Sequence, residues 1–490
     1  MSIETASTLV ALSPDLVVTV GAVLVLLTDL FQPKSHRSCQ GLTAACLLVG
    51  LICSIMLGQS QLGPMHPWAA RVLVVDSMTA ACKGLICLLA LLVVMVSYRS
   101  FDEEERHPGE YYTMILFVTL GMLVVAASNE FLTFFVAFEL LSIPLYMLVG
   151  FRRYEVTSAE AGLKYFLTGA ASSAILLFGI SWIYGATATT QFNQLAQGVK
   201  PGTLSLFLLG LVFVLVALGF KISAAPFHMW APDAYQGGPT PVVALLSTAP
   251  KAAMLVFILR LFANNLNGLP EKYGPELMYL FAALATLSVV VGNLVALPQS
   301  DLRRLLAYSG VAQIGYILIG VMSSVGNPSE GMGAGSVLFY LVVYTLTNVG
   351  LWTVVQLIGS QTNSYAIADL AGLSRRNPFL ALVLLFGLLS LAGAPPFSGF
   401  VGKVYLFRAA FSIEPMVVVV GVLGSVISLY YYFGILKLVY FDQPEEGEVL
   451  AVAPVQKLVL SLCLASTVVL GLWPTLAEHC YQIAEGSLGL

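Results

Sequence analysis

Charged residues are scarce in this sequence, and their scarcity decides its structural class. Asp, Glu, Lys and Arg make up 10% of the 490 residues, whereas hydrophobic residues make up 58%. Soluble domains contain about 25% charged residues, so this chain needs a surrounding other than water. It also lacks any long polar stretch from which a separate soluble domain could be built. These absences argue against a water-soluble enzyme or binding domain.

Patterns for metal, haem and nucleic-acid binding are lacking as well. The seven cysteines form no C-x-x-C pair and no zinc spacing. Cys39, Cys46 and Cys53 recur every seven residues, and we expect small buried residues there rather than metal ligands. Only His228, of five histidines, lies in an apolar stretch away from the loops, which argues against bis-histidine haem. The net charge of −4 is too small to indicate a nucleic-acid partner.

Long apolar runs are what the sequence does contain. Runs of about 20 residues can cross the hydrocarbon core as helices, and helices pair their own backbone groups in lipid. Glu4 and the absence of a basic leader indicate a retained first helix rather than a cleaved signal peptide. We predict an all-α integral membrane protein with about fourteen transmembrane helices. They are expected at residues 9–30, 41–57, 73–98, 111–127, 131–150, 159–184, 204–235, 241–262, 277–297, 302–322, 336–358, 379–411, 416–439 and 455–472.

The distribution of Lys and Arg between connections predicts orientation, because basic loops remain cytoplasmic. Connections after even-numbered helices contain few basic residues, and those after odd-numbered helices contain more. The bias places both termini on the non-cytoplasmic side. The even-numbered connections contain Arg71, Lys200, Arg260 and Lys272. The odd-numbered connections contain Lys34, Arg37, Arg99, Arg106, Arg152, Arg153, Arg303, Arg304, Arg375, Arg376, Lys437 and Lys457.

Two of the predicted helices are interrupted by proline. Pro226 lies within helix 7 and Pro396 within helix 12, with Lys221 near the first and Lys403 near the second. A proline inside a helix removes a hydrogen bond, and matched interruptions in oppositely directed helices are typical of inverted repeats. We therefore predict two inverted five-helix repeats, helices 4–8 and 9–13; two unrelated kinks are the alternative. The expected division is 1–110 (three N-terminal helices), 111–265 (first repeat), 266–440 (inverted second repeat) and 441–490 (helix 14 and a short tail).

Four ionisable residues lie inside apolar runs: Glu139, Lys221, Lys251 and Lys403. A charge at mid-bilayer costs at least about 2.5–3.5 kcal/mol, so such residues indicate function. Burial disfavours the charged form of a lysine, so its amine can exchange a proton near neutral pH, and a nearby carboxylate opposes that effect. We expect a proton relay in which Glu139 pairs with Lys221. Four charges of purely structural origin are the alternative.

A second set of residues is expected to assist the relay through water. It comprises His228, Lys164, Tyr308 and Gln313, together with Ser142. Two of these residues, Lys164 and His228, have a simpler interpretation. Lys164, like Lys83, could extend its ammonium group to the membrane interface, and His228 could be a buried histidine whose hydrogen bonds are satisfied.

Three segments resemble the antiporter-like proton-translocating subunits of respiratory complex I (NADH:quinone oxidoreductase), a family that also includes cation/proton antiporter subunits. They are GFKISAAPFHMWAPDAYQGGPTPVVALLSTAPKAA at 219–253, FFVAFELLSIPLYMLVG at 134–150 and DLRRLLAYSGVAQIGY at 301–316. The resemblance extends over nearly the whole chain. Within the family, the turn at Asp233–Gly237, the short C-terminal region and Lys403 resemble subunit N, also called subunit 2.

The resemblance implies a non-redox subunit of a proton-pumping translocase in a bacterial inner membrane or an equivalent energy-transducing membrane. Glu139 and Lys221 would be the coupling pair, Lys251 the central proton carrier and Lys403 the exit-side group. NAD, FMN, iron–sulfur clusters and quinone would belong to partner subunits. The expected partners are a neighbouring antiporter-like subunit, small membrane subunits and the lipid bilayer, with no nucleic acid. Gln313 departs from many N-type relatives, which have histidine there.

Other functions remain open at this point. A subunit of a multi-subunit cation/proton antiporter would use the same charges without redox coupling. A structural spacer would use them only to hold neighbouring subunits, and a free-standing solute transporter would need an organic-substrate site that the sequence does not indicate.

Overall fold

The computed structural model confirms an all-helical membrane architecture over the described residues. Among the described residues, the only β pairings are three isolated bridges. Thirteen helices in this part of the chain are long and apolar enough to span a membrane. The interrupted helix 12 adds a fourteenth crossing from two shorter helices. The structure describes residues 3–32, 35–60, 63–97, 108–200, 202–266, 274–327, 331–443, 450–473 and 475–488.

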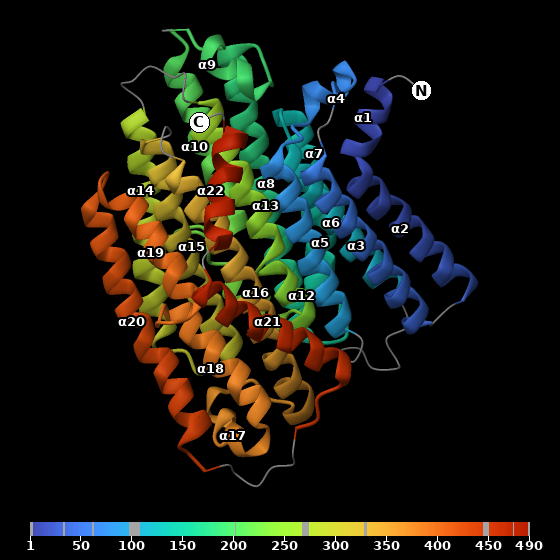
Figure 1. Ribbon diagram of the computed structural model, residues 1–490, viewed down its shortest axis with the longest axis vertical. Helices are drawn as coiled ribbons and strands as arrows, with labels where there is room; N and C mark the ends of the chain where they lie inside the picture. The colour runs from blue at the N-terminus through green and yellow to red at the C-terminus, as the bar shows by residue number, and fades with distance from the viewer. Residues whose placement is uncertain are drawn as a thin grey trace.

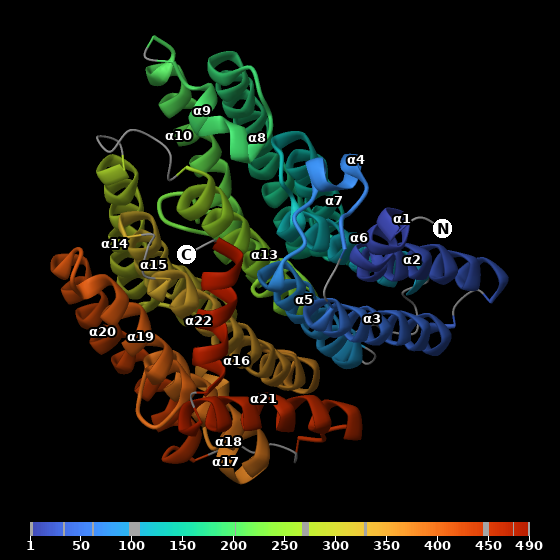
Figure 2. The ribbon, with the colours of Figure 1, turned by 45° about the horizontal axis from the view of Figure 1, so that its top comes forward.

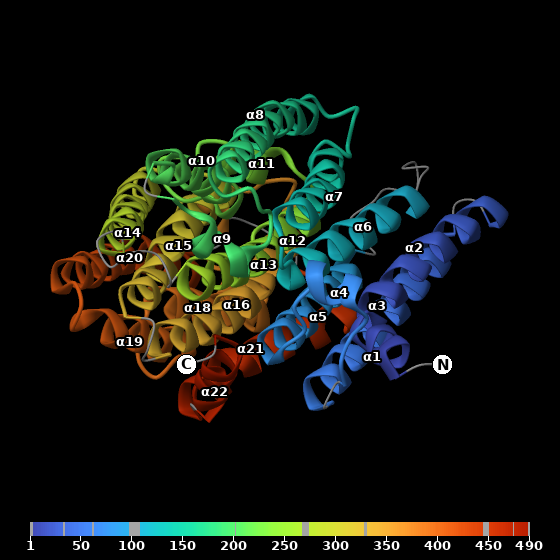
Figure 3. The same ribbon diagram turned by 90° about the horizontal axis from the view of Figure 1, so that it is seen from above.

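The N-terminal helices lie along one side of the bundle. Seen from above, α2 and α3 are at one edge, and α14 and α20 are at the opposite edge (Figure 3). The predicted first span divides into two helices, with a proline in the first turn of the second. The helices are α1 (Ile3–Ala11), α2 (Ser13–Phe31), α3 (His36–Gln59), α4 (Pro67–Val72) and α5 (Ser77–Ser97).

Two series of helices follow, and their elements correspond in order. The first comprises α6 (Pro108–Ala127), α7 (Phe131–Val149), α8 (Val156–Thr187), η1 (Phe192–Gln194), α9 (Leu195–Gly198), α10 (Leu204–Ile222), α11 (Ala231–Gly237), α12 (Thr240–Leu246), α13 (Ala249–Ile258) and the π-helical η2 (Leu259–Asn265). The second comprises α14 (Gly274–Ala296), α15 (Leu302–Gly326), α16 (Met332–Thr362), η4 (Ile367–Leu370), α17 (Leu373–Arg376), α18 (Pro378–Ala392), α19 (Ser398–Phe411) and α20 (Pro415–Tyr440).

The interruptions in the two series have the same local structure. Helix α10 ends at Ser223 with φ +62°, and α18 ends at Gly393 with φ +81°. At each break, the amide of the following alanine donates to a carbonyl within the preceding helix: Ala224 N to Gly219 O at 2.8 Å, and Ala394 N to Leu389 O at 2.9 Å. Each helix therefore ends with a residue in the left-handed conformation and a backbone hydrogen bond between residues five positions apart, which is a common way to end a helix.

Corresponding elements lie at opposite ends of the molecule. The short helix α9, which follows α8, lies at the top of Figure 1, whereas α17, which follows α16, lies at the bottom (Figure 1). An acidic residue before α7 and α15 also forms an equivalent bridge in each series, Glu130 with Gln191 and Asp301 with Ala366. This arrangement is the expected inverted repeat.

The C-terminal helices cover the contact between α5 and the second series. Helix α21 (Pro454–Leu472) packs on α16, α18, α19 and α5. The residues expected to form a short tail contain a further helix, α22 (Thr475–Leu488), which packs along α16 (Figure 2). The Met78 amide of α5 donates to Ser487 Oγ of α22 at 3.0 Å.

The basic residues used to predict orientation are only partly described. Lys34, Arg99, Arg106 and Lys272 lie outside the described residues. Arg260, which was counted as a loop residue, is instead buried in η2, with its side chain 3% exposed.

Candidate functional site

Lys221 occupies the last turn of α10, and its side chain is enclosed by α7 and α8. Its Nζ donates to Ser142 Oγ at 2.7 Å and to Tyr165 OH at 3.3 Å. The ammonium group also lies 5.3 Å from the ring centroids of Phe138 and Tyr146. Hydroxyl oxygens and ring faces both attract a cation. Among the residues that the structure describes, no acidic side chain is in direct contact with this buried lysine.

Glu139 lies one helical turn before Ser142 on α7, close to the pocket but outside direct contact. Among the described residues, no Glu139 oxygen lies within 4.0 Å of Lys221 Nζ, the distance that defines an ion pair. The Glu139 side chain is half-buried, and its Oε1 has no hydrogen-bond partner in the described part of the chain. The structure thus brings the two expected partners to the same pocket with the Ser142 hydroxyl bonded to Lys221.

Lys251 lies in the first turn of α13, directly after the break that separates α12 from α13. Its Nζ is 3.4 Å from Tyr344 OH on α16. The same tyrosine donates to the backbone oxygen of Ser247 at 3.1 Å. Lys251 is 1% exposed, so its ammonium group is in the interior with a phenol as its hydrogen-bond partner.

Aromatic rings fill the space between Lys221 and Lys251. The Tyr165 ring, beside Lys221, stacks on Trp230 at 4.3 Å between centroids. Trp230 meets Tyr235 edge to face at 6.3 Å, and the Tyr235 centroid is 5.9 Å from Lys251 Nζ. A continuous series of aromatic contacts therefore connects the surroundings of the two lysines.

Lys403, on α19, points back at the end of α18. Its Nζ donates to the carbonyl oxygens of Leu391 at 2.9 Å and Ala392 at 3.1 Å, and to Ser425 Oγ at 3.2 Å. The ammonium group also lies over the Tyr316 ring at 4.2 Å. A helix C-terminus bears partial negative charge, so the interruption in helix 12 supplies a site for a cation.

Gln313 is directly linked to the Lys403 site. Its Nε2 donates to Leu391 O at 2.9 Å, and Tyr340 OH donates to its Oε1 at 2.6 Å. One turn earlier on α15, Ser309 is hydrogen-bonded to Tyr432. These buried side chains form a polar layer between α15, α16 and α20.

His228 and Tyr308 lie together at the interruption of helix 7. Their rings are 6.1 Å apart in an edge-to-face arrangement, and both side chains are half-buried. The His228 Nδ1 is buried and has no hydrogen-bond partner among the described residues. In the described part of the chain, neither residue makes a hydrogen bond or ring contact with the three buried lysines, so the structure groups these two residues with each other.

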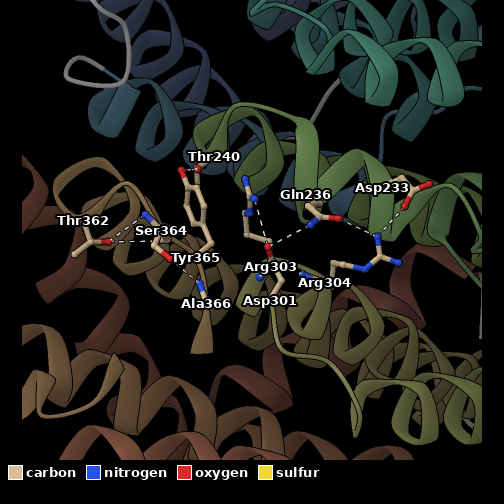
Figure 4. Close-up of polar contacts among 10 residues, drawn as sticks. All are labelled: Asp233, Gln236, Thr240, Asp301, Arg303, Arg304, Thr362, Ser364, Tyr365 and Ala366. Atoms are coloured by element: carbon tan, nitrogen blue, oxygen red, sulfur yellow. Dashed lines mark hydrogen bonds and ion pairs between the residues drawn. The ribbon is translucent and has the colours of Figure 1, made fainter. Parts of the chain in front are cut away.

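Lys164 belongs to an ion-pair network at one end of the bundle. Its Nζ is 2.8 Å from Glu160 and 2.9 Å from Asp233 Oδ2. Arg304 Nη1 contacts the other Asp233 oxygen at 2.8 Å and Gln236 Oε1 at 3.0 Å (Figure 4). Asp233 lies between the spanning helices α10 and α12. Burial raises the pKa of its carboxyl, but the bonds from Lys164 and Arg304 outweigh burial and hold that pKa below its ordinary value.

The same network continues to the start of α15. Asp301 caps that helix by accepting from the amides of Arg303 at 2.8 Å and Arg304 at 3.2 Å. Gln236 Nε2 donates to Asp301 at 3.4 Å, and Arg303 lies 3.7 Å over the Tyr365 ring (Figure 4). A cavity of about 440 Å³ opens among these groups. Lys164 therefore lines a polar cavity and does not belong with the buried lysines Lys221, Lys251 and Lys403.

Two buried ion pairs of α5 escaped the sequence analysis. Lys83 Nζ is 2.5 Å from Asp15 Oδ2, with side-chain exposures of 1% and 9%. Arg260 is 3.1 Å from Asp76, which also caps α5 by accepting from the Thr79 amide at 2.7 Å. The sequence did contain a signal for the first pair: Asp15 and Lys83 each lie inside an apolar run, and a charge in such a run predicts a partner inside the membrane.

No group of three or more His, Cys, Asp or Glu side chains suited to a metal ion occurs in the part of the chain that the structure describes. Of the heptad cysteines, Cys39 is buried, whereas Cys46 and Cys53 are half-buried.

Comparison with known proteins identifies the family. The membrane-domain family described as NADH:quinone oxidoreductase/Mrp antiporter matches residues 128–428. The chain belongs to this family. All four principal relay candidates lie within the matched segment, so they are part of the NADH:quinone oxidoreductase/Mrp antiporter domain itself.

Individual relatives confirm the resemblance to complex I subunits. Subunit N of NADH-quinone oxidoreductase from Desulforamulus reducens is 41% identical over 416 residues, covering 84% of this chain and 86% of that protein. A chain of respiratory complex I from Thermus thermophilus superimposes with a TM-score of 0.79 at 33% identity, over 94% of this chain and 97% of that one. A chain of the Mrp complex from Dietzia has a TM-score of 0.83 at 22% identity, over 98% of both chains, and shares the fold.

Proposed function

We propose that this chain is the N-type membrane subunit of an NADH:quinone oxidoreductase and that it moves protons through a relay of Glu139, Lys221, Lys251 and Lys403. Quinone reduction in partner subunits drives the relay. The 41% identity to a subunit N supports the assignment to that enzyme.

One observation supports the proton-transfer role above all others. Lys221, Lys251 and Lys403 are each no more than 3% exposed, and among the described residues none has an acidic side chain within ion-pair distance. A buried charge without a counter-ion is costly, so such a lysine gives up its proton readily. A purely structural lysine would be expected to have a carboxylate partner, as Lys83 has.

The contacts of each lysine suit a particular place in the relay. Glu139 approaches Lys221 closely enough to influence its charge without fixing it in an ion pair, which suits a coupling pair. Lys251 has a phenolic partner on the second series of helices, which suits a central carrier. Lys403 lies at the interruption of helix 12 between backbone carbonyls, which suits an exit-side group.

The remaining assignments follow from membership in the complex. NAD, FMN, iron–sulfur clusters and quinone belong to partner subunits, and this chain contains no electron-transfer site. Its neighbours are another antiporter-like subunit and small membrane subunits, in a bacterial inner membrane or an equivalent energy-transducing membrane. Both termini face the non-cytoplasmic side. The functional division is 1–110, 111–265, 266–440 and 441–490.

Proton pumping in sealed membrane vesicles tests the proposal, with quinone reduction followed in parallel. Lys221→Ala, Lys251→Ala and Lys403→Ala are compared with Lys437→Ala, which removes an exposed lysine. We expect the three buried-lysine variants to assemble and to lose pumping, while Lys437→Ala behaves as the wild type. Normal pumping by all three variants would show that the lysines are structural.

Purification of the assembled complex distinguishes the antiporter alternative. We expect iron–sulfur and quinone-site subunits to co-purify with this chain. Their absence, combined with sodium-dependent proton movement, would place the chain in a cation/proton antiporter instead.

A further inference from the structure

The helix that contains Lys251 is irregular at both ends. Helix α13 begins after the break at Thr248 and passes into the π-helical η2 at Leu259. π-helical turns often occur at functional sites. Because α13 follows a break at its start and changes to π-helical hydrogen bonding at its end, side-chain contacts at the two ends help to set how it is rotated and therefore where Lys251 points.

At its start, α13 is held by α16. Tyr344 on α16 accepts from Lys251 at 3.4 Å and donates to Ser247 O, just before the break, at 3.1 Å. This pair of contacts defines the Lys251 site, but it depends on the spacing between α13 and α16.

At its far end, where α13 passes into η2, the segment is held at the start of α5 by a charge pair in which Arg260 is buried and Asp76 is half-buried. Arg260 Nη2 donates to Asp76 Oδ1 at 3.1 Å and to Thr79 Oγ1 at 2.9 Å, and Nη1 is 3.1 Å from Asp76 Oδ2. The planar guanidinium can hold a carboxylate in one orientation. The π-helical end of the Lys251 segment is thus fixed to the first turn of α5.

Helix α5 is also fixed to α16. Gln356 on α16 donates to Val96 O, in the last turn of α5, at 2.9 Å. The helix that holds Arg260 therefore also holds the helix of Tyr344, and the spacing of Lys251 from Tyr344 depends on α5.

We propose that Asp76 and Arg260 form a positioning pair that keeps Lys251 in register with Tyr344 for proton transfer. The inference rests on the proposed relay function, and it assigns no proton transfer to Asp76 or Arg260 themselves. Neutralising Asp76 frees the π-helical end of α13, so Lys251 no longer meets Tyr344 in a single geometry.

Asp76→Asn is the direct test, because asparagine still caps a helix but removes the charge that holds Arg260. The matched control is Asp15→Asn, which breaks the other buried charge pair of α5 without touching α13. Protons moved per quinone reduced are measured in vesicles and normalised to assembled complex, together with the KM for quinone. A purely structural role would change the amount of complex and leave this ratio unchanged.

We expect Asp76→Asn to lower the ratio by the same amount as Lys251→Ala, because a misplacement of about 1 Å can slow a transfer step about a hundredfold and so stop transfer through this subunit. Asp15→Asn should keep the wild-type ratio, and the KM for quinone should be unchanged in both. A wild-type ratio in Asp76→Asn, or an equal loss in Asp15→Asn, overturns the proposal.

Two further variants make every outcome informative. If Asp76→Asn fails to assemble, Asp76→Asn with Arg260→Gln leaves no buried charge without a partner; a low ratio then supports positioning, and a wild-type ratio overturns it. Lys251→Ala is measured alongside. If Lys251→Ala pumps normally, the relay function fails; if it does not pump but Asp76→Asn does, only the positioning role fails.

Discussion

Gln313 and Lys403 donate hydrogen bonds to the same acceptor, the carbonyl oxygen of Leu391, each at 2.9 Å. The carbonyl belongs to the last turn of α18, where the helix is interrupted. Tyr340 fixes the other end of the Gln313 amide at 2.6 Å. Gln313 therefore sets the orientation of the acceptor that Lys403 uses.

Replacing Gln313 tests this link. Gln313→Leu keeps the side-chain size but leaves Tyr340 OH and one lone pair of Leu391 O without their partner. We expect pumping to fall by about threefold to tenfold, since one hydrogen bond contributes about 0.5–1.5 kcal/mol. Gln313→His keeps a donor and should retain most activity in the vesicle assay. Equal activity of the two variants would separate Gln313 from the function of Lys403.

The Ser142 hydroxyl makes the shortest contact of Lys221, at 2.7 Å. In Ser142→Ala, Lys221 retains only Tyr165 and the surrounding rings, so its charged form is less favourable. We expect slower pumping with normal assembly, measured in vesicles. The control is Ser54→Ala, because the Ser54 hydroxyl donates to Gly50 O within its own helix. Full activity in Ser142→Ala would show that the Tyr165 contact suffices.

Gly399 lies in the first turn of α19, where a side chain has no room. A Cβ at this position would lie 1.8 Å from the backbone oxygen of Ser390. Gly399→Ala must displace α19 from α18, and we expect overpacking to cost about 1–3 kcal/mol and to reduce assembly. Gly434→Ala is the control, since nothing lies within 4 Å of its Cβ. Thermal denaturation and complex yield measure both variants. Normal yield of Gly399→Ala would contradict the close approach of these helices.

The Asp15–Lys83 pair allows a test of stability that is independent of pumping. Lys83→Met leaves the Asp15 carboxylate buried without its partner, which costs about 3–5 kcal/mol. Adding Asp15→Leu should recover most of the loss, because two apolar side chains then meet. In the exposed pair Arg152–Glu155, Glu155→Gln should cost less than about 1 kcal/mol. Thermal denaturation of the purified complex checks all three. An unchanged denaturation temperature in Lys83→Met would show that the Asp15–Lys83 pair contributes little to stability.

The spanning helices and their two interruptions were predictable from local features. Length and apolar composition identify a span, and a proline in an apolar run identifies a break, so the disruptions at Pro226 and Pro396 were both anticipated. The inverted repeat followed from their spacing. The break between α12 and α13 escaped prediction because Pro250 lies within the first turn of α13, where a proline is compatible with a helix.

Contacts between distant segments were beyond the sequence analysis. Arg260 was counted as a loop residue because it follows an apolar run, yet its partner Asp76 comes from a helix 184 residues earlier. Lys83 was expected to be able to reach the membrane surface, whereas it is buried against Asp15. Which charges meet depends on helix rotation and packing, which hydrophobic pattern alone does not determine. The roles of the four relay residues remain predictions.

The hydrogen bond between Met78 and Ser487 joins residues 409 positions apart. A ribosome releases the amide of residue 78 into the membrane long before it makes Ser487. The first turn of α5, which holds Arg260 through Asp76, therefore gains this neighbour only after residue 487 has been synthesised. Substitutions or insertions near residue 487 would thus alter the surroundings of Asp76.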